Sequence, residues 1–374
     1  NTVAEFWAMS DSLIFKQLFD QTSATYSYLL ADERSRQAVF IDTVYEQHER
    51  DLSLVHELEL SLVACMETHC HADHVTGAWL LKHTTGCQIM ASCGSDIKLL
   101  DRMLTQDDLV EFGSHSLTVI ETPGHTDGCL SFLLDDESMV FTGDSLLIRG
   151  CGRTDFQRGS AQQLYHSIKD KLFALPDRCI VYPAHDYAGR TATSIDEEKK
   201  LNPRIGGQAN ETDFVGYLEN MELPHPKKLD IAVPANLNAG RPEDDCLPIQ
   251  PAWAPVVTTY SGVLEISPQW VAGHIDDVHI LDVRTRAETE EEGTRIKGAQ
   301  LIPINELRDR IAEIPQLKPV MTICRSGKRS ILAFSILQDA GWGKVANING
   351  GLIRWSDEGL PISKPSKLGS TKSN

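Results

Sequence analysis

The sequence lacks the features that mark several special classes of protein. Its nine cysteines are an odd number without a C-x-x-C pair, which argues against a secreted disulfide framework and favours a reducing compartment. No apolar run approaches the roughly 20 residues that cross a membrane. The opening NTVAEFWAMSDS shows neither a signal-peptide nor an arginine-rich transit pattern, and residues 1–8 ahead of Met9 are of undecided origin. We therefore expect a bacterial cytoplasmic protein, with the mitochondrial matrix as the alternative.

Positive charge is also scarce. The chain has 35 Lys and Arg against 53 Asp and Glu, which gives a formal net charge of −18. A protein that grips nucleic acid needs cations to replace the counterions of the phosphates, and an anionic membrane surface makes a similar demand. We expect neither partner. A small anionic substrate stays compatible, because a local basic pocket can lie within an acidic surface.

The size of the chain allows two domains. Its 374 residues, 41% of them hydrophobic, suffice for two separate cores. From about residue 224 the composition changes, and the segment 223–256 holds seven prolines with little periodicity, as an extended linker does. We predict a first domain at 10–224, a linker at 225–255 and a second domain at 256–364.

Apolar patterns predict α/β structure in both domains. In the first, strands are expected at 38–42, 60–69, 116–125, 129–136, 138–144 and 179–186, and helices at 48–60 and 161–174. In the second, strands are expected at 279–284 and 319–327, and helices at 305–314 and 328–341. The segment 135–137 is typical of a hairpin turn. Several strands of the first domain end in His, Asp or Gly, and layered α/β proteins build their sites at such ends.

The most specific motif is THCHADH at 68–74, which places four candidate metal ligands within six residues. In an extended segment alternate side chains share a face, so His69 and His71 can converge. Three further pieces stand at strand ends: PGHT with His125, TGD with Asp144, and PAHD with His185. Imidazole and carboxylate suit Zn, Fe or Mn. A solvated histidine cluster is the alternative, and the three matching pieces argue against it.

These four pieces, in this order, resemble the metallo-β-lactamase superfamily, an αββα sandwich with a metal site at one edge. The resemblance covers roughly residues 13–240. One branch of that superfamily is glyoxalase II, a binuclear hydrolase of glutathione thioesters with a helical C-terminal domain. The stretches THCHADHVTG, GDSLLIRGCGRTDFQRG, YPAHDYAG and LNPR are similar instead to the persulfide dioxygenase branch. The proline-rich segment that follows soon after Arg204 agrees with this second branch.

The resemblance implies one Fe(II) per chain, held by His69, His125 and Asp144. Two imidazoles and one carboxylate on one face of an octahedron leave three coordination positions open for the substrate sulfur and O₂. The groups expected to orient these ligands and tune the iron are His71, Asp73, His74, His185 and Asp186. The residue types alone also allow them to complete a second metal site.

The implied reaction converts glutathione persulfide, O₂ and water into glutathione and sulfite. The resemblance assigns the contacts with the glutathione moiety to Arg153, Tyr187 and Arg204. Arginine binds carboxylates in a bidentate manner, and glutathione has two of them. The alternative is that the arginines form structural ion pairs with acidic neighbours, namely Asp155, Asp186 or Glu198. Cys151, beside the pocket loop, is expected to be a packing residue.

A second strong motif, CRSGKRS at 324–330, lies between an apolar strand and a helix. A strand-to-helix turn aims backbone N–H groups at one point, and the helix N-terminus is electropositive. Cys324 at that focus is expected to be a stabilised thiolate and a nucleophile. The positive charge of Arg325, Lys328 and Arg329 suits thiosulfate or sulfite. A buried structural thiol beside a basic surface is the alternative.

This segment resembles the rhodanese family, and the match extends over about 258–362. Supporting pieces are DVR (282–284), GAQLIPI (298–304) and GGLIRW (350–355), while TRIKGA stands where rhodaneses often have GHIPGA. The loop reads C-x4-R, as in sulfurtransferases, whereas related phosphatases have C-x5-R. The resemblance implies a small α/β domain in which Cys324 carries a persulfide between glutathione persulfide or thiosulfate and sulfite or glutathione. A non-catalytic binding module is the alternative, and a homo-oligomer is compatible with the sequence.

Overall fold

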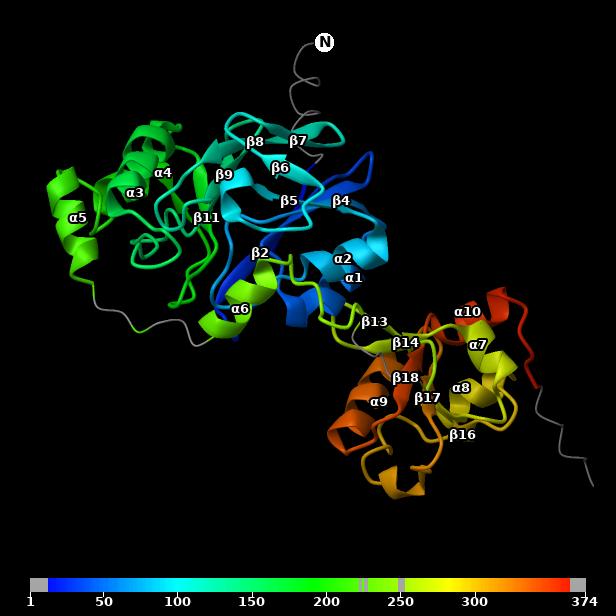
Figure 1. The fold of residues 1–374 in the computed structure, drawn as a ribbon. Coiled ribbons are helices and arrows are strands. Elements are labelled where there is room, and N and C mark those ends of the chain that lie inside the picture. Colours follow the sequence, from blue (N-terminus) through cyan, green and yellow to red (C-terminus); the bar gives the residue numbers. More distant parts are fainter. Residues whose placement is uncertain (1–12, 222–223, 225–227, 248–252, 364–374) are drawn as a thin grey trace, which may run out of the picture. The chain divides into compact units, whose positions relative to one another are not determined.

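The computed structural model describes residues 13–221, 224, 228–247 and 253–363, and Figure 1 shows its fold. The chain divides between Leu247 and Pro248 into two compact units. This division falls inside the segment 225–255 that was expected to link two domains, and the domain bounds given above stay a prediction. In the described part of the chain, no helix is long and apolar enough to cross a membrane.

The first unit contains two sheets of six strands each. The first sheet has the order β1-β2-β3-β4-β5-β6, with bounds Leu13–Asp20, Thr25–Asp32, Gln37–Ile41, Ser61–Met66, Gln88–Ser92 and Arg102–Leu104. The second has the order β12-β11-β10-β9-β8-β7, with bounds Thr193–Ser194, Ile180–Pro183, Met139–Gly143, Leu130–Leu134, His115–Glu121 and Leu109–Phe112. Apolar side chains of both sheets, such as Tyr28, Phe132 and Phe141, share one buried cluster, so the sheets pack face to face.

Helices cover the two outer faces of this pair of sheets. The outer face of the first sheet packs against α1 (His48–Glu57), α2 (Ala78–Thr85) and α6 (Leu229–Asn236). The outer face of the second packs against α3 (Ala161–His166), α4 (Ile195–Leu201) and α5 (Glu211–Glu219), with α3 continued by a π turn, Ser167–Lys171, and a 3-10 turn, Leu172–Ala174. Two further 3-10 turns are Tyr45–Gln47 and Cys93–Ser95. The αββα sandwich expected from the sequence is confirmed.

The prediction that 225–255 is extended was wrong over the range of α6. This helix contains Pro234, which lacks a backbone N–H and normally disfavours a helix interior. Val233 of this helix and Leu237 just after it pack against the apolar cluster on the outer face of the first sheet, and Ala232 of the helix is fully buried. Tertiary packing of an apolar face stabilises the helix in spite of the proline.

The second unit is a single six-stranded sheet covered on both faces. Its order is β13-β14-β18-β17-β15-β16, with bounds Val257–Thr258, Leu264–Ile266, Val345–Ile348, Val320–Ile323, His279–Asp282 and Gln300–Leu301. The helices are α7 (Pro268–Gly273), α8 (Arg286–Glu291), α9 (Lys328–Asp339) and α10 (Gly351–Asp357). One apolar cluster lies under α9 and another under α7 and α10, so two cores flank the sheet. The small α/β domain expected from the sequence is confirmed.

One predicted helix of the second unit is largely absent. The segment 305–314 consists of turns followed by a short 3-10 helix, Ile311–Glu313. Pro315 follows Ile314 directly, and a residue before proline is pushed toward extended backbone, as Ile314 is with ψ 126. The apolar spacing of this segment, with Leu307 and Ile314 buried, therefore reflects packing of a turn and not an α-helix.

Candidate functional site

Four strand ends of the first unit meet at one edge. β4 ends just before Thr68 and His69, β8 before the turn with His125, β10 before Asp144 and β11 before His185. β8, β10 and β11 run in one direction, since two antiparallel pairings separate β8 from β10 and the pairing of β10 with β11 is parallel. Their carboxyl ends therefore lie on the same side. The turns that carry the candidate ligands converge, as was predicted from the polar residues at the strand ends.

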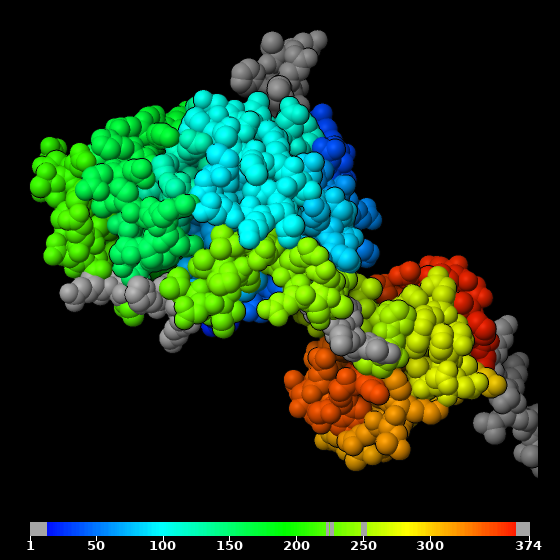
Figure 2. Space-filling model, viewed as in Figure 1, coloured from blue at the N-terminus to red at the C-terminus, as the bar shows by residue number. Residues whose placement is uncertain are grey.

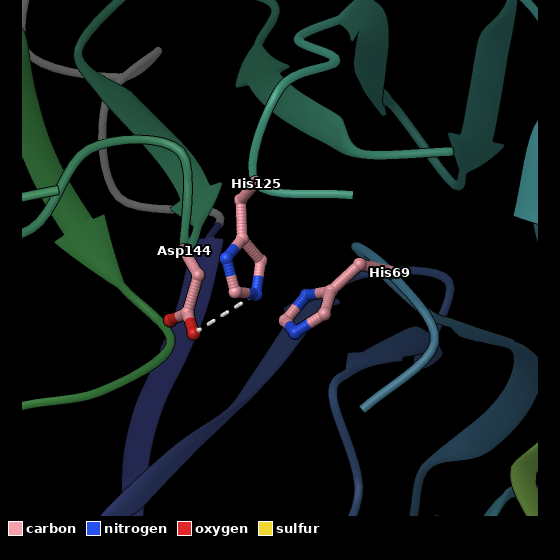
Figure 3. A group of neighbouring side chains, drawn as sticks. All are labelled: His69, His125 and Asp144. Atoms are coloured by element: carbon pink, nitrogen blue, oxygen red, sulfur yellow. Dashed lines mark ion pairs between the residues drawn. The ribbon is translucent and has the colours of Figure 1, made fainter. Parts of the chain in front are cut away.

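The predicted triad is brought together. One ligand atom each from His69, His125 and Asp144 lies within 4.8 Å of the other two. Figure 3 shows the two imidazoles and the carboxylate pointing toward one another from three separate segments, with His125 Nε2 3.5 Å from Asp144 Oδ2. His69 and His125 are 2% and 4% exposed, so these donors face each other in a water-poor site.

Hydrogen bonds fix where the protons of both imidazoles lie. His125 Nδ1 is 2.6 Å from the carbonyl oxygen of Arg153, which can only accept, so Nδ1 carries the hydrogen. Thr68 donates its single hydroxyl hydrogen to Asp42 at 2.8 Å, and its oxygen therefore accepts from His69 Nδ1 at 2.9 Å. Burial also lowers the pKa of both rings, which favours the neutral form. Both Nε2 atoms are thus left with an unshared lone pair.

Asp144 is held in place by His185. Its Oδ1 lies 2.7 Å from His185 Nδ1, which leaves Oδ2 as the oxygen that faces the imidazoles. The other nitrogen of His185 is 2.9 Å from the carboxylate of Asp73. Although burial raises the pKa of Asp144, the neighbouring histidines lower it well below its usual range. His185 therefore orients a carboxylate that stays ionised.

A second donor set lies behind the triad. Ligand atoms of His71, Asp73 and His74 lie within 4.8 Å of one another, and His71 Nδ1 and His74 Nε2 are buried without a hydrogen-bond partner among the described residues. His71 Nε2 faces two buried carboxylates, Asp42 at 3.1 Å and Glu67 at 3.4 Å. Burial alone would lower the pKa of His71, but these carboxylates raise it to about 10.

Two of these neighbours were missed from the sequence. Asp42 and Glu67 were not among the predicted residues, although Asp42 directly follows strand β3 in the same pattern of apolar run and acidic residue that marked Asp144. Asp186, which was predicted to support the metal ligands, accepts hydrogen bonds from the backbone of Ala188 and from the backbone and guanidinium of Arg190. Those contacts shape the turn after β11.

A cavity of about 840 Å³ opens onto the triad and receives all three residues expected to contact glutathione. Arg153 donates to both oxygens of Asp155 at 2.6 Å and to the carbonyl oxygen of Pro224 at 2.7 Å. Tyr187 is 79% exposed at the cavity and stacks on His185 at a centroid distance of 6.1 Å. Cys151, 2% exposed, belongs to the apolar cluster of the second sheet's outer face and also lines the cavity wall.

The two predicted arginines differ in charge compensation. Each other cation that lines the cavity has an acidic partner: Arg149 has Glu197 and Glu198, Arg153 has Asp155, Arg190 has Asp186, and Lys228 has Glu46. Arg204 has none in the described part of the chain. It donates to the carbonyl oxygen of Cys151 at 2.6 Å and lies 5.4 Å from the ring of Tyr217. Among the described residues, Arg204 is therefore the cation of this cavity that has no acidic partner. Its remaining N–H groups can donate to an anion in the cavity.

In the second unit, the predicted loop connects β17 to α9. Cys324 is 1% exposed, and the hydroxyl of Ser330 lies 3.5 Å from its sulfur. Gly327, with φ 86, turns the loop into the helix, and a Cβ at Gly351 would come within 2.6 Å of both Cys324 O and Gly327 N. Burial alone would raise the pKa of Cys324, but hydrogen bonds from Ser330 and from loop N–H groups lower it below the usual value. The loop therefore stabilises the thiolate of Cys324 relative to that of an ordinary cysteine.

The basic residues of this loop divide into two kinds. Arg329 forms two hydrogen bonds with Glu288, at 2.7 and 2.6 Å, and Glu288 also caps the start of α8. Arg325 is 60% exposed with Glu292 no closer than 3.7 Å, and Lys328 is exposed as well. Arg329 is thus held by Glu288 and also interacts with the sulfur of Cys324, while Arg325 and Lys328 are exposed to an incoming anion. The role of Glu288 was not foreseen from the sequence.

Family models match both units. The model of the metallo-β-lactamase superfamily matches residues 90–185, and that of the rhodanese-like domain matches residues 267–358. Among curated relatives, the mitochondrial persulfide dioxygenases ETHE1 of Mus musculus and Homo sapiens are each 48% identical over 229 residues, which are 61% of this chain and 89% of the relative. Hydroxyacylglutathione hydrolase of Rhizobium johnstonii is 38% identical over 151 residues, 39% of this chain and 57% of that relative.

Solved structures agree with these matches. The crystal structure of ETHE1 from Myxococcus xanthus is 49% identical with a TM-score of 0.59, and the match covers 61% of this chain and 99% of that one. A metallo-beta-lactamase from Staphylococcus aureus is 23% identical with a TM-score of 0.58, covering 91% of this chain and 99% of that one. The second likeness concerns the fold, and its coverage extends through both units.

Proposed function

Because the chain belongs to the ETHE1 persulfide dioxygenase family and carries a C-terminal rhodanese-like domain, we propose that it oxidises glutathione persulfide and also transfers sulfur through Cys324. The first reaction is glutathione persulfide plus O₂ and water, giving glutathione, sulfite and two protons. The second moves the outer sulfur of a persulfide to sulfite and gives thiosulfate, or runs in reverse. Sulfite links the two, as product of one and substrate of the other.

The observation that carries this proposal is the protonation pattern of the triad. His69 Nε2 and His125 Nε2 have no hydrogen, and the free oxygen of Asp144 faces them. These three donors fit Fe(II), whose two-histidine, one-carboxylate sites leave positions open on one face. When bound there, Fe(II) supplies the activation of O₂ toward sulfur. The protein orients the donors through Thr68, the carbonyl of Arg153 and His185.

The cavity residues are proposed to orient the substrate. The guanidinium of Arg204 is held by the carbonyl of Cys151 and the ring of Tyr217, and its free N–H groups suit a carboxylate of glutathione. Tyr187 and Arg153 border the same cavity. Because Asp155 already neutralises Arg153, we assign the main anionic contact to Arg204 and a smaller, shaping role to Arg153.

The geometry around His185 favours one ion over two. Both nitrogens of His185 contact carboxylates, Asp144 at 2.7 Å and Asp73 at 2.9 Å, which are oxygens that a second ion beside the triad would need. The unpartnered nitrogens of His71 and His74 favour the competing possibility of two ions and glutathione-thioester hydrolysis. We propose one Fe(II) per chain as the resident cofactor.

Product analysis separates these proposals. The full chain is given glutathione persulfide under air, and O₂ uptake, sulfite and thiosulfate are followed together. We expect one sulfite equivalent per O₂ at early times, and thiosulfate as sulfite accumulates. In a parallel reaction with a glutathione thioester we expect no hydrolysis. Thioester hydrolysis without O₂ uptake would overturn the dioxygenase proposal, and sulfite that never becomes thiosulfate would overturn the sulfurtransferase proposal.

A further inference from the structure

Two thiols meet in the core beneath the metal-ligand loop. Cys65 lies in β4, and Cys87 immediately precedes β5; their Sγ atoms are 3.6 Å apart, and the residues are 0% and 2% exposed. In the parallel pairing of these strands Cys65 stands opposite Ile89, and Cys87 lies on the same face two residues earlier. All nine cysteines are free thiols. Among the described residues, the contact between two sulfur atoms is the one between Cys65 and Cys87.

The positions of the two cysteines in the chain give the contact its significance. They are 22 positions apart in the chain, and the segment between them contains the whole THCHADH motif and helix α2. β4 leads into His69, and α2 returns the chain to Cys87. A covalent bond between the sulfurs would therefore close a ring around His69, His71, Asp73 and His74.

We propose that Cys65 and Cys87 are a redox modification site that closes into a reversible disulfide when the protein meets a hydroperoxide. The Cys87 thiol loses its proton, and the thiolate attacks one peroxide oxygen, which gives a sulfenic acid and hydroxide; the hydroxide takes up the released proton and becomes water. The Cys65 thiol then attacks the sulfur of Cys87, the S–S bond forms and water leaves. Two thiols and one hydrogen peroxide thus become one disulfide and two waters, and a thiol reductant reverses the oxidation.

The local structure supports this order of events. Cys87 lies just below the surface, because residues 83–86 before it and Gln88 after it are exposed. The hydrogen bond from Cys65 lowers the pKa of Cys87, whereas burial raises the pKa of Cys65 well above its usual value. In the view of Figure 2, the blue-to-cyan segments around α2 form part of the molecular surface. A small peroxide therefore reaches Cys87 when the turn after α2 opens.

The same turn supplies the movement that bond formation needs. A disulfide bond is about 2.05 Å long, so the sulfurs must approach from 3.6 Å by roughly 1.5 Å. Cys65 is fixed within a central strand that pairs with β3 and β5. Cys87 follows Gly86, a helix-ending residue with φ 78, and neither lies in a strand. Cys87 is the partner that moves.

Peptide mapping tests the proposal on the full, metal-loaded chain. The protein is treated with hydrogen peroxide, the remaining thiols are alkylated, and trypsin is added. Cleavage after Arg50, Lys82 and Lys98 places Cys65 on fragment 51–82 and Cys87 on fragment 83–98. We expect the two fragments joined, two hydrogen atoms lighter than their sum, and separate again after reduction. Fragments that stay separate in the oxidised, folded protein would overturn the proposal.

Variants identify the sulfurs that react. Fragment 51–82 also contains Cys70, and fragment 83–98 also contains the exposed Cys93. Cys65→Ala and Cys87→Ser must each abolish the joined fragment, whereas the matched changes Cys70→Ala and Cys93→Ser must leave it. A joined fragment that survives Cys65→Ala would contradict the assignment.

Melting of the wild-type protein gives a second readout that needs no variant. A bond that closes a ring of this size restricts the unfolded chain, and we expect the oxidised first unit to melt roughly 5–10 °C higher than the reduced one. The shift must disappear on reduction. An oxidised protein that carries the bond but melts at the same or a lower temperature would show that the ring does not stabilise the metal-ligand loop. None of these measurements depends on the proposed reaction.

Discussion

The two units build their reactive centres in opposite ways. The metal centre of the first unit collects His69, His125 and Asp144 from turns after three different strands. Hydrogen-bond partners elsewhere in the chain determine which imidazole nitrogens are protonated and orient the carboxylate. The centre of the second unit is one continuous loop, 324–330, whose own backbone and Ser330 surround Cys324. A site assembled from distant turns depends on the whole sandwich. A site made by one loop depends mainly on the strand and helix that flank it.

The cysteines sharpen this contrast. Cys70 and Cys151 of the first unit are buried, and burial raises the pKa of their thiols to about 12 and about 11. Cys324 is equally buried, but hydrogen bonds to the charged form outweigh the burial, and its pKa falls below the usual value. Burial alone therefore does not decide thiol chemistry. The direction in which the surrounding N–H and O–H groups point decides it.

The largest effect is expected from removing the carboxylate of the metal centre. Asp144→Ala deletes one of three donors and also leaves the buried His185 facing an empty position. We expect iron binding to be lost and O₂ uptake with glutathione persulfide to fall by a factor of about 1,000 or more, measured with an oxygen electrode. Sulfur transfer by the second unit should continue. Loss of both activities at once would show that the two centres do not act independently.

Cys324→Ser is the converse change. Serine keeps the shape of the loop but cannot carry a persulfide, so thiosulfate formation should fall by a factor of about 1,000 or more. The rate of O₂ uptake should stay at the wild-type value. Thiosulfate:glutathione transfer that persists in this variant would support a non-catalytic role for the second unit.

The two pocket arginines are expected to differ. Arg204→Met removes an uncompensated charge from the cavity wall, and we expect KM for glutathione persulfide to rise roughly tenfold to hundredfold with a smaller change in kcat. Arg153→Met removes a guanidinium that Asp155 already neutralises, so its KM should rise only a few-fold. Equal effects of the two changes would contradict the charge argument, and Arg149→Met serves as a control for a paired cation.

The smallest expected effect concerns thiol labelling. Alkylation requires the thiolate, whose fraction rises with pH until the pH passes the pKa. Because the pKa of Cys324 is lowered and that of Cys151 is raised to about 11, we expect Cys324 to be alkylated at least tenfold faster near neutral pH. The advantage should shrink as the pH rises, because the thiolate fraction of Cys324 levels off first. Mass spectrometry of tryptic peptides measures both rates, and equal rates at neutral pH would contradict the loop geometry.

Much of the fold could be predicted from the sequence, because apolar runs and the polar residues after them mark strands and their ends. His69, His125 and Asp144 all stood at such ends, and the structure brings them together. What could not be predicted depends on long-range partners. The proton on His69 is set by Asp42 through Thr68, and Arg329 is engaged by Glu288, which comes 41 residues earlier in the chain. Sequence spacing does not reveal either contact.

The two errors in the predicted elements have different origins. Helix α6 forms at a proline-containing segment because its apolar face packs beneath the first sheet, and no local signal outweighs the proline. The segment 305–314 has helical spacing, but Pro315 limits it to turns and a short 3-10 helix. In the first case tertiary packing outweighs the local preference, and in the second the adjacent proline outweighs the helical spacing of the apolar residues.

Titration of the metal-free protein with Fe(II), followed by O₂ uptake with glutathione persulfide at each step, tests the central claim most directly. If the two bare imidazole nitrogens and the free oxygen of Asp144 form the working site, activity rises linearly and stops at one iron per chain. Activity that continues to rise to two ions per chain, or that appears with zinc in place of iron, would contradict the account.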